Sequence, residues 1–99
     1  MTQNDTALGR VVISKAGRDK GRPFLIVDIA DDNHVFIADG VTHGMKRPKK
    51  KKLMHLRVVE AKSEFVSAAL RTMKNVSDAD VRKALAELGY DTEQEKQEG

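Results

Sequence analysis

Short apolar runs rich in β-branched residues alternate with clusters of turn residues through the first part of the chain. Runs such as residues 11–13 and 24–27 are typical of strands. The turn signal Asp31-Asp32-Asn33 predicts a hairpin between two of these strands, because Asp and Asn side chains bond to their own backbone in tight turns. The expected strands span residues 10–15, 24–29, 34–38, part of 41–45, and 53–59.

Side chains alternate between the two faces of a strand, so the position of each apolar residue predicts its face. In the second and third strands, one set of side chains is expected in the core. The other set is expected on a face that the C-terminal helices cover. The predicted core set is Leu25, Val27, Ile29, Val35 and Ile37, and the predicted helix-facing set is Phe24, Ile26 and Phe36.

The spacing of apolar residues changes to a helical period after residue 62. Ser63 is a suitable N-cap for a helix over residues 64–73, and Ser77 for a second helix over residues 78–88. Gly89 is a typical residue at the end of a helix. The predicted apolar stripes are Phe65, Ala69, Leu70 and Met73 on the first helix, and Val81, Leu85 and Leu88 on the second.

These elements predict a mainly β fold with a C-terminal α segment: a small SH3-like antiparallel barrel followed by two short helices. A chain of 99 residues has room for one such domain. We expect a flexible N-terminus (1–8), the barrel (9–62), a helical segment packed on the barrel (63–89) and a disordered acidic tail (90–99). The absence of cysteine, of a long apolar run and of a signal-peptide pattern favours a cytoplasmic protein that does not enter membranes.

Charge is distributed unevenly along the chain. Residues 1–62 contain 13 basic and 7 acidic residues, whereas residues 63–99 contain 5 basic and 8 acidic residues. The basic part therefore indicates a polyanionic partner, and the acidic part is expected to lie away from it.

Two segments concentrate the basic residues. The first is a predicted loop in which Gly17, Gly21 and Pro23 bracket basic side chains. Its glycines fit either a turn or a backbone whose N–H groups approach phosphates. The second, residues 46–52, is predicted to be an exposed loop, because like charges repel and Pro48 interrupts strand pairing. The candidate residues for binding the polyanionic partner are Lys15, Arg18, Lys20, Arg22, Lys46, Arg47, Lys49, Lys50, Lys51, Lys52 and His55.

Catalytic and metal chemistry have little support in the sequence. The separations of His34, His43 and His55 match no metal-binding motif, and no glycine-rich nucleotide-binding loop occurs. We therefore expect a protein that is not an enzyme and has no cofactor. Phe24 and Phe36 are expected to pack against the helices rather than to stack on bases.

The residues described above resemble a KOW motif. More narrowly, the chain resembles the fourteen-e family of large-subunit ribosomal proteins from archaea and eukaryotes, over roughly residues 9–89. This resemblance implies an SH3-like barrel that binds ribosomal RNA without catalysis, within the translation apparatus and in contact with ribosomal proteins. The compact chain is also similar to bacterial KOW RNA-binding proteins, which are relatives of that family. The matching segments are residues 9–13, 17–22, 24–29, 31–33, 55–56 and 77–85.

Two other functions fit the same residues. SH3-like barrels also bind proteins, so the chain can be a module that docks on a ribosome-associated or transcription-associated partner. Binding to DNA through lysine attraction alone is a second alternative. For the leading hypothesis, binding of structured RNA, we expect a monomer when the protein is free.

Overall fold

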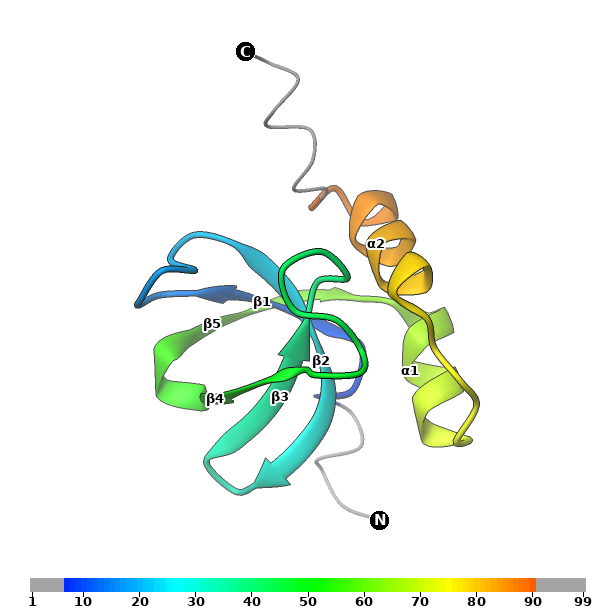
Figure 1. The fold of residues 1–99 in the computed structure, drawn as a ribbon, viewed down its shortest axis with the longest axis horizontal. Coiled ribbons are helices and arrows are strands. Elements are labelled where there is room, and N and C mark those ends of the chain that lie inside the picture. The colour runs from blue at the N-terminus through cyan, green and yellow to red at the C-terminus, as the bar shows by residue number, and fades with distance from the viewer. Residues whose placement is uncertain (1–6, 91–99) are drawn as a thin grey trace.

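The computed structural model describes residues 7–90. The elements are β1 (Arg10–Ser14), β2 (Pro23–Asp31), β3 (His34–Ala38), β4 (Lys49–Lys52), the 3-10 turn η2 (Leu53–His55), β5 (Leu56–Lys62), α1 (Glu64–Arg71) and α2 (Asp78–Glu87). The strands form one antiparallel sheet in the order β4-β3-β2-β1-β5, and both helices lie on one side of it (Figure 1). The predicted fold class, a small SH3-like barrel followed by two helices, is confirmed. The predictions for residues 1–6 and 91–99 lie outside the described residues.

The core consists of two apolar clusters, one on each face of the curled sheet. The inner cluster joins side chains from β1, β2, β3 and β5, and the outer cluster joins the sheet to both helices. The buried members of the inner cluster are Val12, Phe24, Ile26, Val35, Ile37 and Leu56. The buried members of the outer cluster are Val11, Leu25, Val27, Ala38, Val66, Ala69, Val76, Val81, Ala84 and Leu85.

The predicted faces of β2 were therefore wrong in part, and a β-bulge explains why. The register with β3 shifts between Ile26 and Asp28, so Val27 is an extra residue on the β2 side. Simple alternation would place Ile29 on the same face as Val27, but after the bulge Ile29 packs with Ile26 in the inner cluster. The faces of Leu25 and Val27, which contact the helix-covered cluster, were consequently exchanged with those of Phe24 and Ile26. The predictions for β3 were correct, with Val35 and Ile37 inside and Phe36 on the helix side.

Both helices begin where the sequence predicts. The Ser63 hydroxyl accepts a hydrogen bond from the Val66 N–H, and Ser77 forms a reciprocal capping box with Asp80. In α2, Val81 and Leu85 are buried as predicted.

The apolar stripe of α1 was predicted correctly only in part: Ala69 is buried and Leu70 packs against the outer cluster, but Phe65 and Met73 do not. Its buried residues are Val66, Ser67 and Ala69, whereas Phe65 is 65% exposed and Met73 is 89% exposed. The helix ends at Arg71, so Met73 lies beyond the helical period on which its predicted face depended. Phe65 and Met73 are thus exposed apolar side chains on the helical side of the molecule.

No strand forms within residues 41–45, where a fourth strand was expected. The carboxylate of Asp39 explains this, because its Oδ1 accepts hydrogen bonds from three successive N–H groups, those of Val41, Thr42 and His43. A single acceptor can collect three consecutive donors only if the backbone coils around it, and such a backbone is not extended. The fourth strand is instead the lysine run Lys49–Lys52.

Candidate nucleic-acid interface

The first basic segment, residues 15–22, is a compact turn that we call the cationic loop. Gly17 and Gly21 have φ angles of 79° and 87°, which side chains rarely allow. The Gly21 N–H donates to the Ser14 carbonyl at 2.8 Å, and the Lys20 N–H donates to the Gly17 carbonyl at 3.2 Å. The loop is therefore shaped by its own backbone hydrogen bonds. The N–H of Gly21 is engaged in this turn, which favours the turn role for Gly21 over the alternative in which its N–H approaches phosphates.

The second basic segment is an edge strand rather than the predicted exposed loop. Lys49–Lys52 pairs along β3, with Lys49 opposite Ile37, Lys50 opposite Phe36 and Lys51 opposite Val35. Alternation along the strand places successive ammonium groups on opposite faces, which reduces the repulsion that argued against a strand. Lysines are also common on edge strands, where they oppose pairing with other chains.

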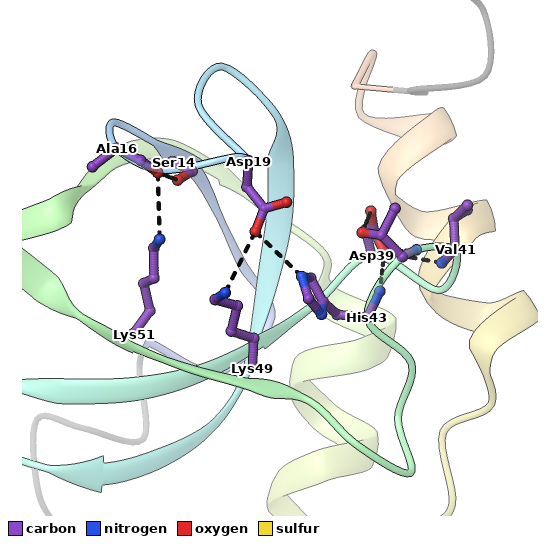
Figure 2. Close-up of polar contacts among 9 residues, drawn as sticks. Ser14, Ala16, Asp19, Asp39, Val41, His43, Lys49 and Lys51 are labelled. Atoms are coloured by element: carbon purple, nitrogen blue, oxygen red, sulfur yellow. Dashed lines mark hydrogen bonds and ion pairs between the residues drawn. The ribbon is translucent and has the colours of Figure 1, made fainter.

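Lys49 and Lys51 extend from β4 toward the cationic loop (Figure 2). The Lys51 ammonium donates to the carbonyl of Ala16 at 3.5 Å. The Lys49 ammonium lies 3.9 Å from a carboxylate oxygen of Asp19. The two basic segments, far apart in sequence, thus form one continuous surface, which we call the cationic face.

Asp19 is a member of this surface that the sequence did not single out. The same oxygen that approaches Lys49 lies 3.2 Å from Nε2 of His43, and the Asp19 side chain is only 13% exposed. Asp19 therefore links the cationic loop to β4 and to residues 39–47 (Figure 2). The signal in the sequence was one acidic residue among the basic residues of the loop.

Residues 39–47, which we call the clamp loop, connect this end of the barrel to α2. The Met45 N–H donates to Asp78 at 2.7 Å, and the Arg82 guanidinium donates to the Gly40 carbonyl at 2.7 Å. Asp39 is buried at the base of the loop. Burial acts to raise its pKa, but the hydrogen bonds from His43, Val41 and Thr42 outweigh this, so the pKa of Asp39 is lowered.

The remaining predicted residues occupy four places. Lys15 and His55 are exposed and adjoin each other, because the Lys15 N–H donates to the His55 carbonyl at 2.8 Å. Arg18 and Lys20 are exposed in the cationic loop, where Arg22 is half-buried. Lys50 and Lys52 lie on the opposite face of β4 from Lys49 and Lys51, and Lys46 and Arg47 are exposed in the clamp loop.

Phe24 is fully buried, and its ring centroid lies 5.8 Å from that of His43, so it is not available to stack on a base. Phe36 packs against the helix-covered cluster. The histidines and acidic residues of the described part of the chain form no group of three that could hold a metal ion. Within residues 7–90, no helix has both the length and the apolar character needed to span a bilayer.

Sequence comparison identifies archaeal relatives. No family model matches the chain. The large ribosomal subunit protein eL14 of Desulfurococcus amylolyticus is 35% identical over 83% of this chain and 78% of its own length. The eL14 proteins of Pyrobaculum calidifontis and Aeropyrum pernix are 33% and 30% identical over 83% of this chain, and the matches cover 73% and 75% of their lengths. The chain therefore belongs to the eL14 family of large ribosomal subunit proteins.

Proposed function

We propose that this protein binds large-subunit ribosomal RNA through the cationic face and associates with the large ribosomal subunit in the cytoplasm. The observation that carries the proposal is the contact between the two basic segments, in which Lys51 reaches Ala16 and Lys49 approaches Asp19. The names of its relatives support the ribosomal assignment. Membership in a family of ribosomal proteins confirms the expectation that the chain is not an enzyme.

The chemistry of the proposed contact is phosphate recognition. Lys15, Arg18 and Lys20 are exposed and form no side-chain hydrogen bond or ion pair with residues 7–90. Their charges are therefore available to phosphates, whose neutralisation releases condensed counterions. The backbone hydrogen bonds of the cationic loop and the pairing of β4 fix the geometry before binding. If about 5 phosphates are contacted, the logarithm of the association constant should fall with the logarithm of salt concentration with a slope of roughly −3.5 to −4.5.

A pair of charge-matched triple variants tests the proposal. One replaces Arg18, Lys20 and Arg22 with Glu, and the control replaces Arg71, Lys74 and Lys83, exposed residues of the C-terminal helical segment, with Glu. Both change the net charge equally. Binding to an in vitro transcript of large-subunit ribosomal RNA is measured over a series of salt concentrations, and circular dichroism checks the fold.

We expect the first variant to weaken binding strongly and to reduce the salt slope by about 3, because each lost phosphate contact removes about one unit. The helical control should retain most of the slope. Equal losses in both variants would show that only net charge matters and would overturn the assigned surface. Unchanged RNA binding in the first variant would favour the protein-docking alternative. Equal competition by duplex DNA would remove the proposed selectivity for RNA.

A further inference from the structure

An open pocket lies at the end of β4, between the β2–β3 hairpin and η2. It has a volume of about 480 Å³, and we call it the turn pocket. The Leu53 N–H donates to the Asn33 carbonyl at 2.8 Å, which fixes the two sides of the pocket together. Met54 contributes to the lining although its side chain is 68% exposed. The lining residues are Asn33, His34, Lys52, Leu53 and Met54.

The pocket combines an apolar surface with a few polar groups. Leu53 and Met54 provide the apolar part, and the flexible, polarisable thioether of methionine adapts to flat ligands. The Asn33 amide has both a donor and an acceptor, and its side chain forms no hydrogen bond with residues 7–90. His34 donates through Nδ1 to Asp31 at 2.9 Å, because a carboxylate can only accept, so neutral His34 keeps Nε2 as an acceptor. This combination suits the edge and face of a nucleobase.

The surrounding charges define how a nucleotide would lie. Lys52 lines the pocket where β4 ends. The following turn, η2, ends at His55, whose carbonyl accepts a hydrogen bond from the Lys15 N–H. At the hairpin tip, the hydrogen bonds from His34 and from the Asn33 N–H lower the pKa of Asp31, so this carboxylate stays ionised and repels phosphate. Phosphates are therefore favoured on the side of the pocket that Lys52 lines, away from Asp31.

We propose that the turn pocket binds one unpaired nucleotide of the RNA, with its base against Leu53 and Met54 and its phosphate near Lys52. This inference rests on the proposed function, since it concerns how the same RNA is recognised. It adds a contact that phosphate attraction alone does not provide, because an unstacked base can enter the pocket whereas a base within a continuous duplex cannot.

The test compares a fully paired RNA hairpin with four otherwise identical hairpins that carry a single unpaired A, C, G or U in the stem. The protein variants are Met54→Ser and Asn33→Ala, and the matched control is Met73→Ser, which changes a strongly exposed methionine on the helical side. In a second measurement, the unpaired U is replaced by 4-thiouridine and crosslinked by ultraviolet light. Trypsin cleaves after Lys52 and Arg57, so a crosslink to Leu53 or Met54, against which the base is proposed to lie, falls on the peptide of residues 53–57.

We expect the wild type and Met73→Ser to bind at least one hairpin with an unpaired nucleotide about five- to tenfold more tightly than the paired hairpin. This gain in affinity lies in the lower part of the range for contacts with one unstacked base. Met54→Ser and Asn33→Ala should lose this preference while binding the paired hairpin as the wild type does. The crosslink should fall on residues 53–57.

Equal binding of all five hairpins by the wild type, a preference that survives both pocket variants, or crosslinks confined to the cationic loop would each overturn the turn pocket and leave the proposed function intact. A wild type that binds neither the hairpins nor the large-subunit ribosomal RNA transcript would instead contradict the proposed function, and the pocket with it. The two failures are thus distinguishable.

Discussion

The cationic loop and the clamp loop lie at the same end of the barrel and contain similar residues, yet they are stabilised differently. Each has a glycine with positive φ and an aspartate with several partners, Gly21 and Asp19 in the cationic loop and Gly40 and Asp39 in the clamp loop. Gly40 packs against α2, whereas a side chain at Gly21 would meet nothing within 4 Å. Asp39 is buried, whereas Asp19 is half-buried. The clamp loop is held against α2, while the cationic loop contacts β4 and the clamp loop through Ala16 and Asp19 and leaves other charged side chains exposed.

Replacing Gly40 and Gly21 with alanine should give the largest difference in stability between the two loops. A Cβ at Gly40 would lie 2.5 Å from the Asp78 carbonyl oxygen, and the φ of 78° adds backbone strain. We expect Gly40→Ala to lower the free energy of unfolding by about 3 kcal/mol, from left-handed strain and overpacking together. Gly21→Ala, with the same backbone strain in open space, should cost only about 1 to 2 kcal/mol. Urea unfolding measures both, and equal losses would show that α2 does not brace the clamp loop.

The aspartate of the clamp loop should have the next largest effect. Asp39→Ala leaves the N–H groups of Val41, Thr42 and His43 without their acceptor, so we expect a loss of about 2 to 3 kcal/mol at pH 7. The exposed Glu60→Ala is the control and should change stability by less than about 0.5 kcal/mol.

This effect depends on pH in a defined direction. Because the folded pKa of Asp39 is lowered, its stabilisation is present above the ordinary value of 3.8 and is lost as pH falls through the folded pKa. The difference in unfolding free energy between the wild type and Asp39→Ala should therefore narrow below pH 3.8. A difference that stays constant down to pH 2 would show that the carboxylate charge contributes nothing.

These two loops also show what the sequence could and could not predict. The turn at residues 15–22 follows from local signals, since two glycines and a proline mark it whatever surrounds it. The coiling at residues 41–43 depends on a single carboxylate that captures three N–H groups, which apolar spacing does not reveal. The bulge at Val27 likewise follows from pairing with β3, and one bulge exchanges the predicted faces of a strand.

The sequence predicted which basic residues belong to the cationic face, but not how they are arranged in space. The lysine run was predicted to be a loop because neighbouring like charges in sequence repel. That prediction did not take into account that a strand places successive side chains on opposite faces. In the structure, Lys49 and Lys51 face the cationic loop while Lys50 and Lys52 face away. Asp19 and Met54 were not singled out, because their importance comes from neighbours that the chain brings together only when folded.

The aspartate of the cationic loop should affect binding rather than folding. Asp19→Asn removes a negative charge 3.9 Å from the Lys49 ammonium and preserves an oxygen that can face His43. We expect binding to large-subunit ribosomal RNA to strengthen about three- to fivefold at low salt, with the gain shrinking as salt screens it. The control, Glu87→Gln on α2, makes the same change of charge at a position far from the cationic loop in sequence. It should leave the affinity for the RNA nearly unchanged. Weaker binding by Asp19→Asn would show that Asp19 matters more for positioning Lys49 than for neutralising it.

The smallest expected effect concerns Met73, the one non-glycine residue with positive φ among residues 7–90. Its φ is 63° and its side chain is 89% exposed, so it bears the strain that glycine avoids at Gly21 and gains little from packing. Met73→Gly removes about 1 to 2 kcal/mol of strain but adds about 0.5 to 1 kcal/mol of backbone entropy to the unfolded state. We therefore expect a net stabilisation of about 0.5 kcal/mol in urea unfolding, whereas Lys74→Gly, at a neighbour without positive φ, should destabilise. A loss of stability in Met73→Gly would mean that the methionine side chain makes stabilising contacts. Residues 21 and 73 could then not be treated as equivalent exposed positions with positive φ.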